Sequence, residues 1–166
     1  MPVILQNILR FVSLVLLQVL VLNNIHFLGY ICPYLYVLFI LSLPLGTPRW
    51  LELILAFVLG ITIDIFSNTM GLHAFATVLI AFLRQPAIKL FVSLHEEGST
   101  YSPSLRTFGI ADYLKYMFTL VLIHHATLFG MEAFNWIDFN NLLLRMLLSW
   151  LVSVLLLLAI QVLKKE

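Results

Sequence analysis

The feature that most limits how this chain can fold is a series of long apolar stretches separated by short polar breaks. These stretches are continuously apolar and do not alternate with polar residues, which predicts helices and not the strands of a barrel. They cover residues 4–22, 31–45, 50–66, 69–83, 113–133 and 142–163. Only 10% of the 166 residues are charged, against about a quarter in soluble domains, so the apolar surface has to face lipid. We therefore expect an all-α, polytopic membrane protein, with residues 1–166 forming one compact bundle of six transmembrane helices.

Two of these stretches are short for a membrane span. Residues 31–45 and 69–83 fall below the roughly 17 to 25 residues that a spanning helix usually has. They either extend into flanking residues or lie in a locally thinned bilayer, and five spans or a re-entrant segment remain the alternative to six. Residues 86–94 form either an interfacial helix or a continuation of the fourth span.

Lysine and arginine are distributed unevenly among the connections, and this asymmetry predicts the orientation. The second and fourth connections and the C-terminal end carry basic residues, whereas the first, third and fifth connections carry none. Cytoplasmic connections are enriched in such residues, so we expect both termini and a long loop over residues 84–112 to be cytoplasmic. The basic residues on this side are Arg49, Arg84, Lys89, Arg106, Lys164 and Lys165.

Asp64 is the most informative single residue, because a charge at membrane depth is costly and usually faces the bundle interior or a partner. It lies near the outer end of the third stretch, and Arg145 lies at a similar depth in the sixth. An ion pair between Asp64 and Arg145 would offset the cost of both charges. Alternatively, Asp64 caps the turn before the fourth stretch. Either arrangement would fix packing, and a binding or gating role is the functional alternative.

Histidines and small residues are the remaining candidates for a site. His124 and His125 are adjacent and diverge by about 100° on a helix, so the two rings cannot easily share one metal ion. We expect His124 and His73 to form interhelical hydrogen bonds, with a proton relay or a metal site as the alternatives. Gly60 and Gly71, with Ala56, permit close approach of the third and fourth helices.

Several function classes find no support in the residues. The chain lacks the motifs of phosphate-binding loops, serine hydrolases and zinc proteases, and no polar part is large enough to fold as a catalytic domain. We therefore expect no enzyme, no catalytic residue, and no metal or other cofactor. The net charge of +1 gives no general attraction for nucleic acid, and the expected environment is the lipid bilayer.

One part of the chain resembles a known family. Residues 56–64 form an apolar helix with Gly60 followed four residues later by Asp64, and Gly71-Leu72-His73-Ala74 then begins the next helix. Pro33-Tyr34-Leu35 opens a short apolar span that ends at Leu43-Pro44. Over about residues 31–84 this pattern is similar to the bacterial rod shape-determining protein family MreD. Elsewhere the similarity is limited to hydropathy.

The resemblance implies a function that the residues alone do not supply. It implies a multi-pass protein of the bacterial cytoplasmic (inner) membrane, acting as a scaffold of the rod complex that elongates peptidoglycan and controls cell shape. The implied partner is an MreC-like membrane protein, and the resemblance also implies work alongside MreB, RodA and a class B penicillin-binding protein. The family has no established catalytic residues.

The family's suggested likeness to the substrate-binding subunits of vitamin transporters implies a second hypothesis, a small-molecule transporter subunit. That hypothesis predicts a polar outer pocket near residues such as Asp64, His73, His124 and Arg145. A membrane enzyme or flippase acting on a lipid-linked precursor is the third hypothesis, and it requires titratable groups that converge on a cavity.

Overall fold

The computed structural model describes residues 3–24, 31–92, 101–133 and 139–163. Apart from an isolated bridge residue at Ile31, the regular structure in these ranges is helical. The elements in chain order are α1 (Val3–Leu20), η1 (Leu22–Asn24), α2 (Val37–Leu41), α3 (Arg49–Ser67), α4 (Leu72–Phe91), α5 (Leu105–Phe108), α6 (Ile110–Glu132) and α7 (Phe139–Leu163). The expected all-helical fold is confirmed.

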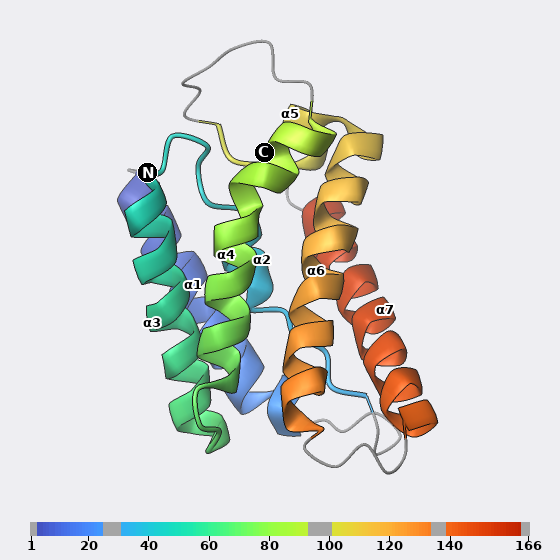
Figure 1. Cartoon of the computed structure of the whole chain (residues 1–166). Coiled ribbons are helices and arrows are strands. Elements are labelled where there is room, and N and C mark those ends of the chain that lie inside the picture. The colour runs from blue at the N-terminus through green and yellow to red at the C-terminus, as the bar shows by residue number, and fades with distance from the viewer. Residues whose placement is uncertain (1–2, 25–30, 93–100, 134–138, 164–166) are drawn as a thin grey trace.

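Five of these helices are long and apolar enough to cross a membrane: the one that reaches from residue 4 to η1, and α3, α4, α6 and α7. They lie roughly side by side, and both ends of the chain lie at the same end of the bundle (Figure 1). Large apolar side chains on the bundle surface remain exposed, such as Ile4 at 74% and Leu163 at 78%. An apolar surface around a well-packed interior is what lipid contact requires. The chain is therefore a multi-pass membrane protein.

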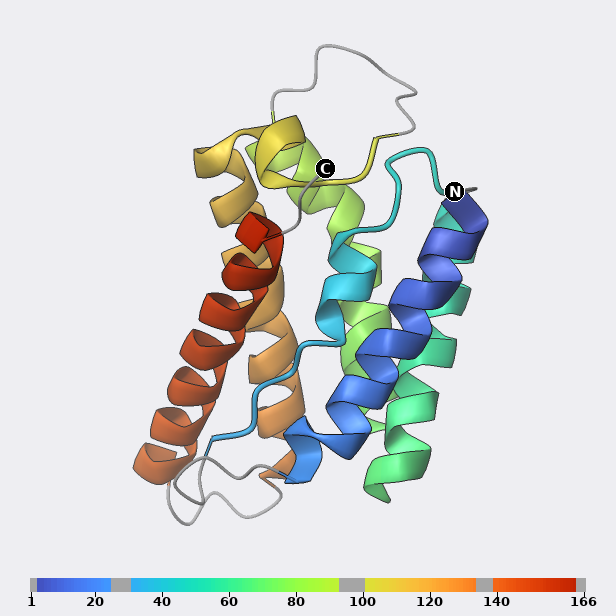
Figure 2. The same cartoon turned by 180° about the vertical axis from the view of Figure 1, so that it is seen from behind.

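The second apolar stretch, residues 31–45, is not a spanning helix, and in this respect the expectation of six helices is wrong. Its helical part is only the five residues of α2, preceded by residues in an extended path. Figure 2 shows this stretch running through the bundle from the end where α1 finishes to the end where α3 begins. As a helix, 15 residues would reach about 22 Å, less than the roughly 30 Å of hydrocarbon. An extended chain covers about twice as much length per residue.

Residues 31–43 are called the central segment below. Non-helical backbone is tolerated at membrane depth only where protein buries it and satisfies its polar groups. Tyr36, Val37, Ile40 and Leu41 are each 0% exposed, so the segment forms the centre of the hydrophobic core.

Side chains of α1 and α7 bond the extended half of the central segment. The backbone N–H of Cys32 donates to Ser149 Oγ at 3.1 Å, and that of Tyr34 donates to Ser153 Oγ at 2.9 Å. Gln18 accepts from Leu35 N–H at 2.9 Å and donates to Pro33 O at 3.0 Å. These polar residues of apolar helices therefore replace the bonds that a regular helix would have made within itself.

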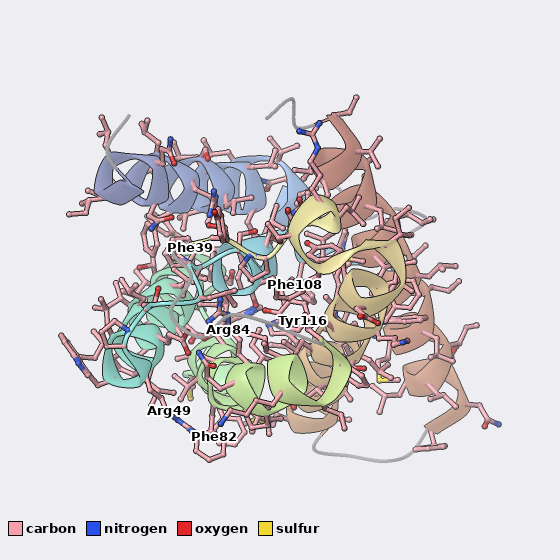
Figure 3. The ribbon with its side chains drawn as sticks, turned by 90° about the horizontal axis from the view of Figure 1, so that it is seen from above. Phe39, Arg49, Phe82, Arg84, Phe108 and Tyr116 are labelled. Carbon is pink, nitrogen blue, oxygen red and sulfur yellow. The ribbon has the colours of Figure 1, made fainter. Side chains whose placement is uncertain are left out.

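The carbonyl groups at the end of α2 are bonded by three other helices. Tyr116 Oη of α6 donates to Leu41 O at 3.1 Å, and Arg10 of α1 donates to Ser42 O at 3.0 Å. Arg84 of α4 donates to Leu43 O. Seen along the bundle, Arg84 and Tyr116 lie beside the centrally placed α2 (Figure 3). The central segment is thus fastened at both halves by the helices around it.

Helix α4 continues to Phe91, which corrects two expectations. The fourth span does not end at residue 83, and residues 84–91 belong to this helix and not to a loop. Of the two alternatives for residues 86–94, continuation of the fourth span is the one confirmed, as far as Phe91. Pro86 lies inside the helix and cannot donate to Phe82 O. That freed carbonyl accepts from Arg49 at 3.4 Å, and the guanidinium lies 4.7 Å from the centre of the Phe82 ring, at the edge of the bundle (Figure 3). The helix therefore tolerates the proline, and the expected loop 84–112 shrinks on both sides, because α6 already begins at Ile110.

Candidate functional site

Asp64 caps the N-terminus of α4. Its carboxylate accepts from the backbone N–H of His73 at 3.1 Å and of Ala74 at 2.9 Å, and also from the hydroxyl of Thr69. The first N–H groups of a helix have no partner within the helix, and a carboxylate there also complements the helix dipole. Asp64 is 2% exposed, so its charge is balanced by these donors inside the bundle.

The expected ion pair between Asp64 and Arg145 is not formed. The ion pairs between described residues are Arg84 with Glu52 and Lys115 with Asp112. Arg145 is exposed on α7, whereas Asp64 faces α4. Capping, the alternative reading, is therefore the one that the structure supports.

Substituting Asp64 should destabilise the protein through this cap. Asp64→Ala should lower the free energy of unfolding by about 1–2 kcal/mol, the usual cost of losing a cap, and Asp64→Asn should cost less because its side-chain oxygen still accepts. Thermal unfolding of the purified protein in detergent measures the effect. Asp112→Asn, in a solvent-exposed pair at the other end of the bundle, is the control. If Arg145→Gln destabilised the protein as much as Asp64→Ala, the assignment of Asp64 as a cap would be wrong.

His73 and His124 meet at a common partner in the central segment. Tyr36 Oη lies 2.7 Å from His73 Nδ1 and 2.8 Å from His124 Nε2. The three side chains come from the central segment, α4 and α6 and are almost fully buried. This bears out the expected interhelical hydrogen bonds, and the central tyrosine that joins the two histidines was missed. Within the described residues there is no group of three or more metal-binding side chains.

The two candidate glycines play different parts. A Cβ on Gly60 would lie 2.4 Å from Ala74 Cα and from Thr77 Oγ1, so only glycine permits this approach of α3 to α4. Gly71 has open space around it but has φ of +82°, a conformation that other residues rarely adopt. Close packing is thus confirmed for Gly60, whereas Gly71 serves the turn. Pro33 lies in the extended half of the central segment, where its carbonyl accepts from Gln18.

An open pocket of about 370 Å³ is lined by residues of η1, of the start of the central segment, of the ends of α3 and α6 and of the start of α4. The ends of α3 and α6 lie at the end of the bundle opposite the two termini (Figure 2). Its polar lining includes Asn23, Asn24, Tyr34, Thr69, His73 and Glu132. Of the residues expected to line such an outer pocket, His73 does so. Asp64, His124 and Arg145 do not.

The most deeply buried charges were not singled out from the sequence. Arg84 and Glu52 are both 0% exposed and form an ion pair between α4 and α3. Gln85 also donates to Glu52, at 3.1 Å. A signal existed: in an antiparallel hairpin, residues equally far from the turn face one another. Gly60 and Thr77 lie opposite one another in the hairpin of α3 and α4. Glu52 precedes Gly60 by about as many residues as Arg84 follows Thr77, so the two charged side chains are expected to face one another.

Comparison with known proteins gives no relative. No family model, no curated protein and no solved structure matches the chain.

Proposed function

We propose that this protein is a membrane scaffold of the bacterial cell-wall elongation complex, in which it binds an MreC-like partner and so contributes to cell shape. One observation of the structure supports a scaffold: several polar side chains at membrane depth bond to the chain's own backbone and side chains. Asp64 caps α4, Arg84 pairs with Glu52, and Tyr36 joins two histidines. The choice of partner rests on the resemblance of residues 31–84 to the MreD family.

The apolar surface offers positions for the single span of a partner. Helices α1 and α7 are the least buried of the five long helices. Only 17% and 22% of the 18-residue apolar stretch in each lies buried inside the bundle. Without water to exclude, helices in a membrane associate through close packing of such surfaces. The same proposal includes three further partners in the complex: MreB, RodA and a class B penicillin-binding protein.

We also infer that the central segment provides a sixth crossing and that both termini are cytoplasmic, in the bacterial inner membrane. The segment runs between the two ends of the bundle, and the termini share one end (Figures 1 and 2). The excess of Lys and Arg in the connections at that end supports the orientation. A reporter active only in the cytoplasm should work at either terminus.

Co-purification tests the scaffold proposal. The tagged full-length chain, extracted from native membranes in mild detergent, should bring with it an MreC-like protein. Tryptophan substitutions at exposed leucines of α7 (Leu144, Leu151 and Leu155) or at exposed residues of α1 (Ile8, Val12 and Leu16) should weaken recovery if that face holds the partner. Equivalent substitution of Phe57 on α3 is the control. Recovery of no such partner would remove the proposal's main support.

The open pocket favours a second candidate, a small-molecule transporter subunit of the vitamin type. Such subunits need a polar cavity reachable from outside, and about 370 Å³ lies within the range of small-molecule sites. Uptake of a vitamin that depends on this chain would favour the transporter over the scaffold.

A further inference from the structure

The open pocket has a distinctive charge. Among the described residues that line it, Glu132 is the only charged side chain, and neither lysine nor arginine is present. Tyr34 and Phe66 add aromatic rings. Carboxylates and aromatic faces attract cations. The nearby cation is Arg145 of α7, whose charge acts on Glu132 from outside the described lining.

Two uncharged groups of the lining, in Asn24 and Thr69, offer acceptor atoms beside the hydroxyl groups of Tyr34 and Ser67. Asn24 uses its N–H₂ group on Val19 O at 3.1 Å and Leu20 O at 3.0 Å, which leaves its side-chain oxygen as an acceptor. The hydroxyl proton of Thr69 is directed to Asp64, so this oxygen also remains an acceptor. A primary ammonium carries three N–H donors and fits such a set of acceptors.

His73 contributes the opposite group, a donor. Its ring is 4% exposed and lines the pocket, its Nδ1 is bonded to Tyr36, and its Nε2 has no hydrogen bond to a described residue. The proton positions follow from His124, whose Nδ1 is buried without a partner. An unpaired buried N–H is rarer than an unpaired acceptor, so the proton of His124 belongs on Nε2.

The remaining protons are then fixed. His124 Nε2–H donates to Tyr36, whose single hydroxyl proton is donated to His73 Nδ1. A neutral His73 therefore carries its own proton on Nε2, the nitrogen left for the pocket. A ligand oxygen beside His73 would accept this proton.

We propose that the pocket binds an ethanolamine-like group, that is, a primary ammonium with an oxygen acceptor a few bonds away. The ammonium lies against Glu132, Asn24 and the aromatic rings, and the oxygen accepts from His73 Nε2–H. The pocket is larger than this group alone, so the same chemistry is available from a free small amine or from the headgroup of phosphatidylethanolamine. This inference goes beyond the scaffold function and does not depend on it.

Calorimetric titration of the full-length protein tests the ligand class. In nanodiscs of phosphatidylcholine, ethanolamine should bind saturably, choline should bind at least about tenfold more weakly because it lacks N–H donors, and acetate should not bind. If the headgroup is the source, nanodiscs with phosphatidylethanolamine should raise the unfolding temperature and reduce ethanolamine binding. If a free amine is the source, that lipid should change neither. Absence of both ethanolamine binding and a lipid effect, or equal binding of choline or acetate, overturns the proposal.

Variants and spectroscopy test the named residues. Glu132→Gln, at the exposed end of α6, should weaken ethanolamine binding at least about tenfold. Asp112→Asn, at the opposite end of the bundle, should leave it unchanged. Nitrogen-15 NMR of labelled histidines should find His73 and His124 both protonated at Nε2. Unchanged binding in Glu132→Gln, or a His73 proton on Nδ1, would overturn the assignment of the binding groups.

Discussion

Replacing Arg84 by methionine should lower the free energy of unfolding by about 3–5 kcal/mol, the range measured when one partner of a buried ion pair is removed. The reason is the charge left behind, because Glu52 is 0% exposed and would retain only the bond from Gln85. The carbonyl of Leu43 would also lose its donor, which loosens the end of the central segment. Unfolding of the purified protein in mixed micelles of increasing denaturing detergent measures the change.

A double variant separates the two causes. Glu52→Met combined with Arg84→Met removes both charges and replaces them by apolar side chains, an exchange that is often neutral in other proteins. It should recover most of the lost stability and retain a deficit of about 1–3 kcal/mol from the unpaired carbonyl of Leu43. If the double variant were as unstable as Arg84→Met alone, the buried charge would not be the cause.

The membrane class and the positions of most helices could be predicted from the sequence, because apolar length alone decides them. The central segment could not be predicted in the same way. Its apolar residues are compatible with a helix, and its extended path depends on partners such as Gln18 and Ser153, which are distant in sequence. Hydropathy gives the same signal for a lipid-facing helix and for a buried strap. What the sequence did show was that the stretch is short for a helix that spans the membrane.

In the candidate site too, features set by neighbouring parts of the chain could be predicted, and features that depend on distant residues could not. The cap by Asp64 and the close approach at Gly60 involve neighbouring helices in a hairpin, so local patterns could indicate them. The bonds of Tyr36 to His73 and His124 join three elements, and no local pattern places a tyrosine between two histidines. Arg84 was assigned to a loop because the fourth helix was expected to end at residue 83, whereas it continues through Pro86 to Phe91.

A side chain at position 60 should separate the two most closely packed helices. Gly60→Ala should lower the free energy of unfolding by about 1–3 kcal/mol, the usual cost of overpacking, and Gly60→Val by more. The added Cβ would lie 2.4 Å from Ala74 Cα and 2.6 Å from Ala74 N. These are backbone atoms of α4 and cannot rotate away, so α4 has to move. Thermal unfolding in detergent provides the measurement.

Gly130 on α6 is the matched control for this substitution. A Cβ there would meet nothing within 4 Å, and alanine is favoured over glycine in a helix by up to about 1 kcal/mol. Gly130→Ala should therefore leave stability unchanged or raise it.

Displacement of α4 also moves His73 and Arg84, which lie on that helix, so Gly60→Val should disturb the pocket and the buried ion pair together. If Gly60→Ala and Gly130→Ala had the same effect on the free energy of unfolding, the contact between α3 and α4 would not be as close as described. The positions given for the pocket residue His73 and for the ion pair of Arg84, both on α4, would then also be wrong.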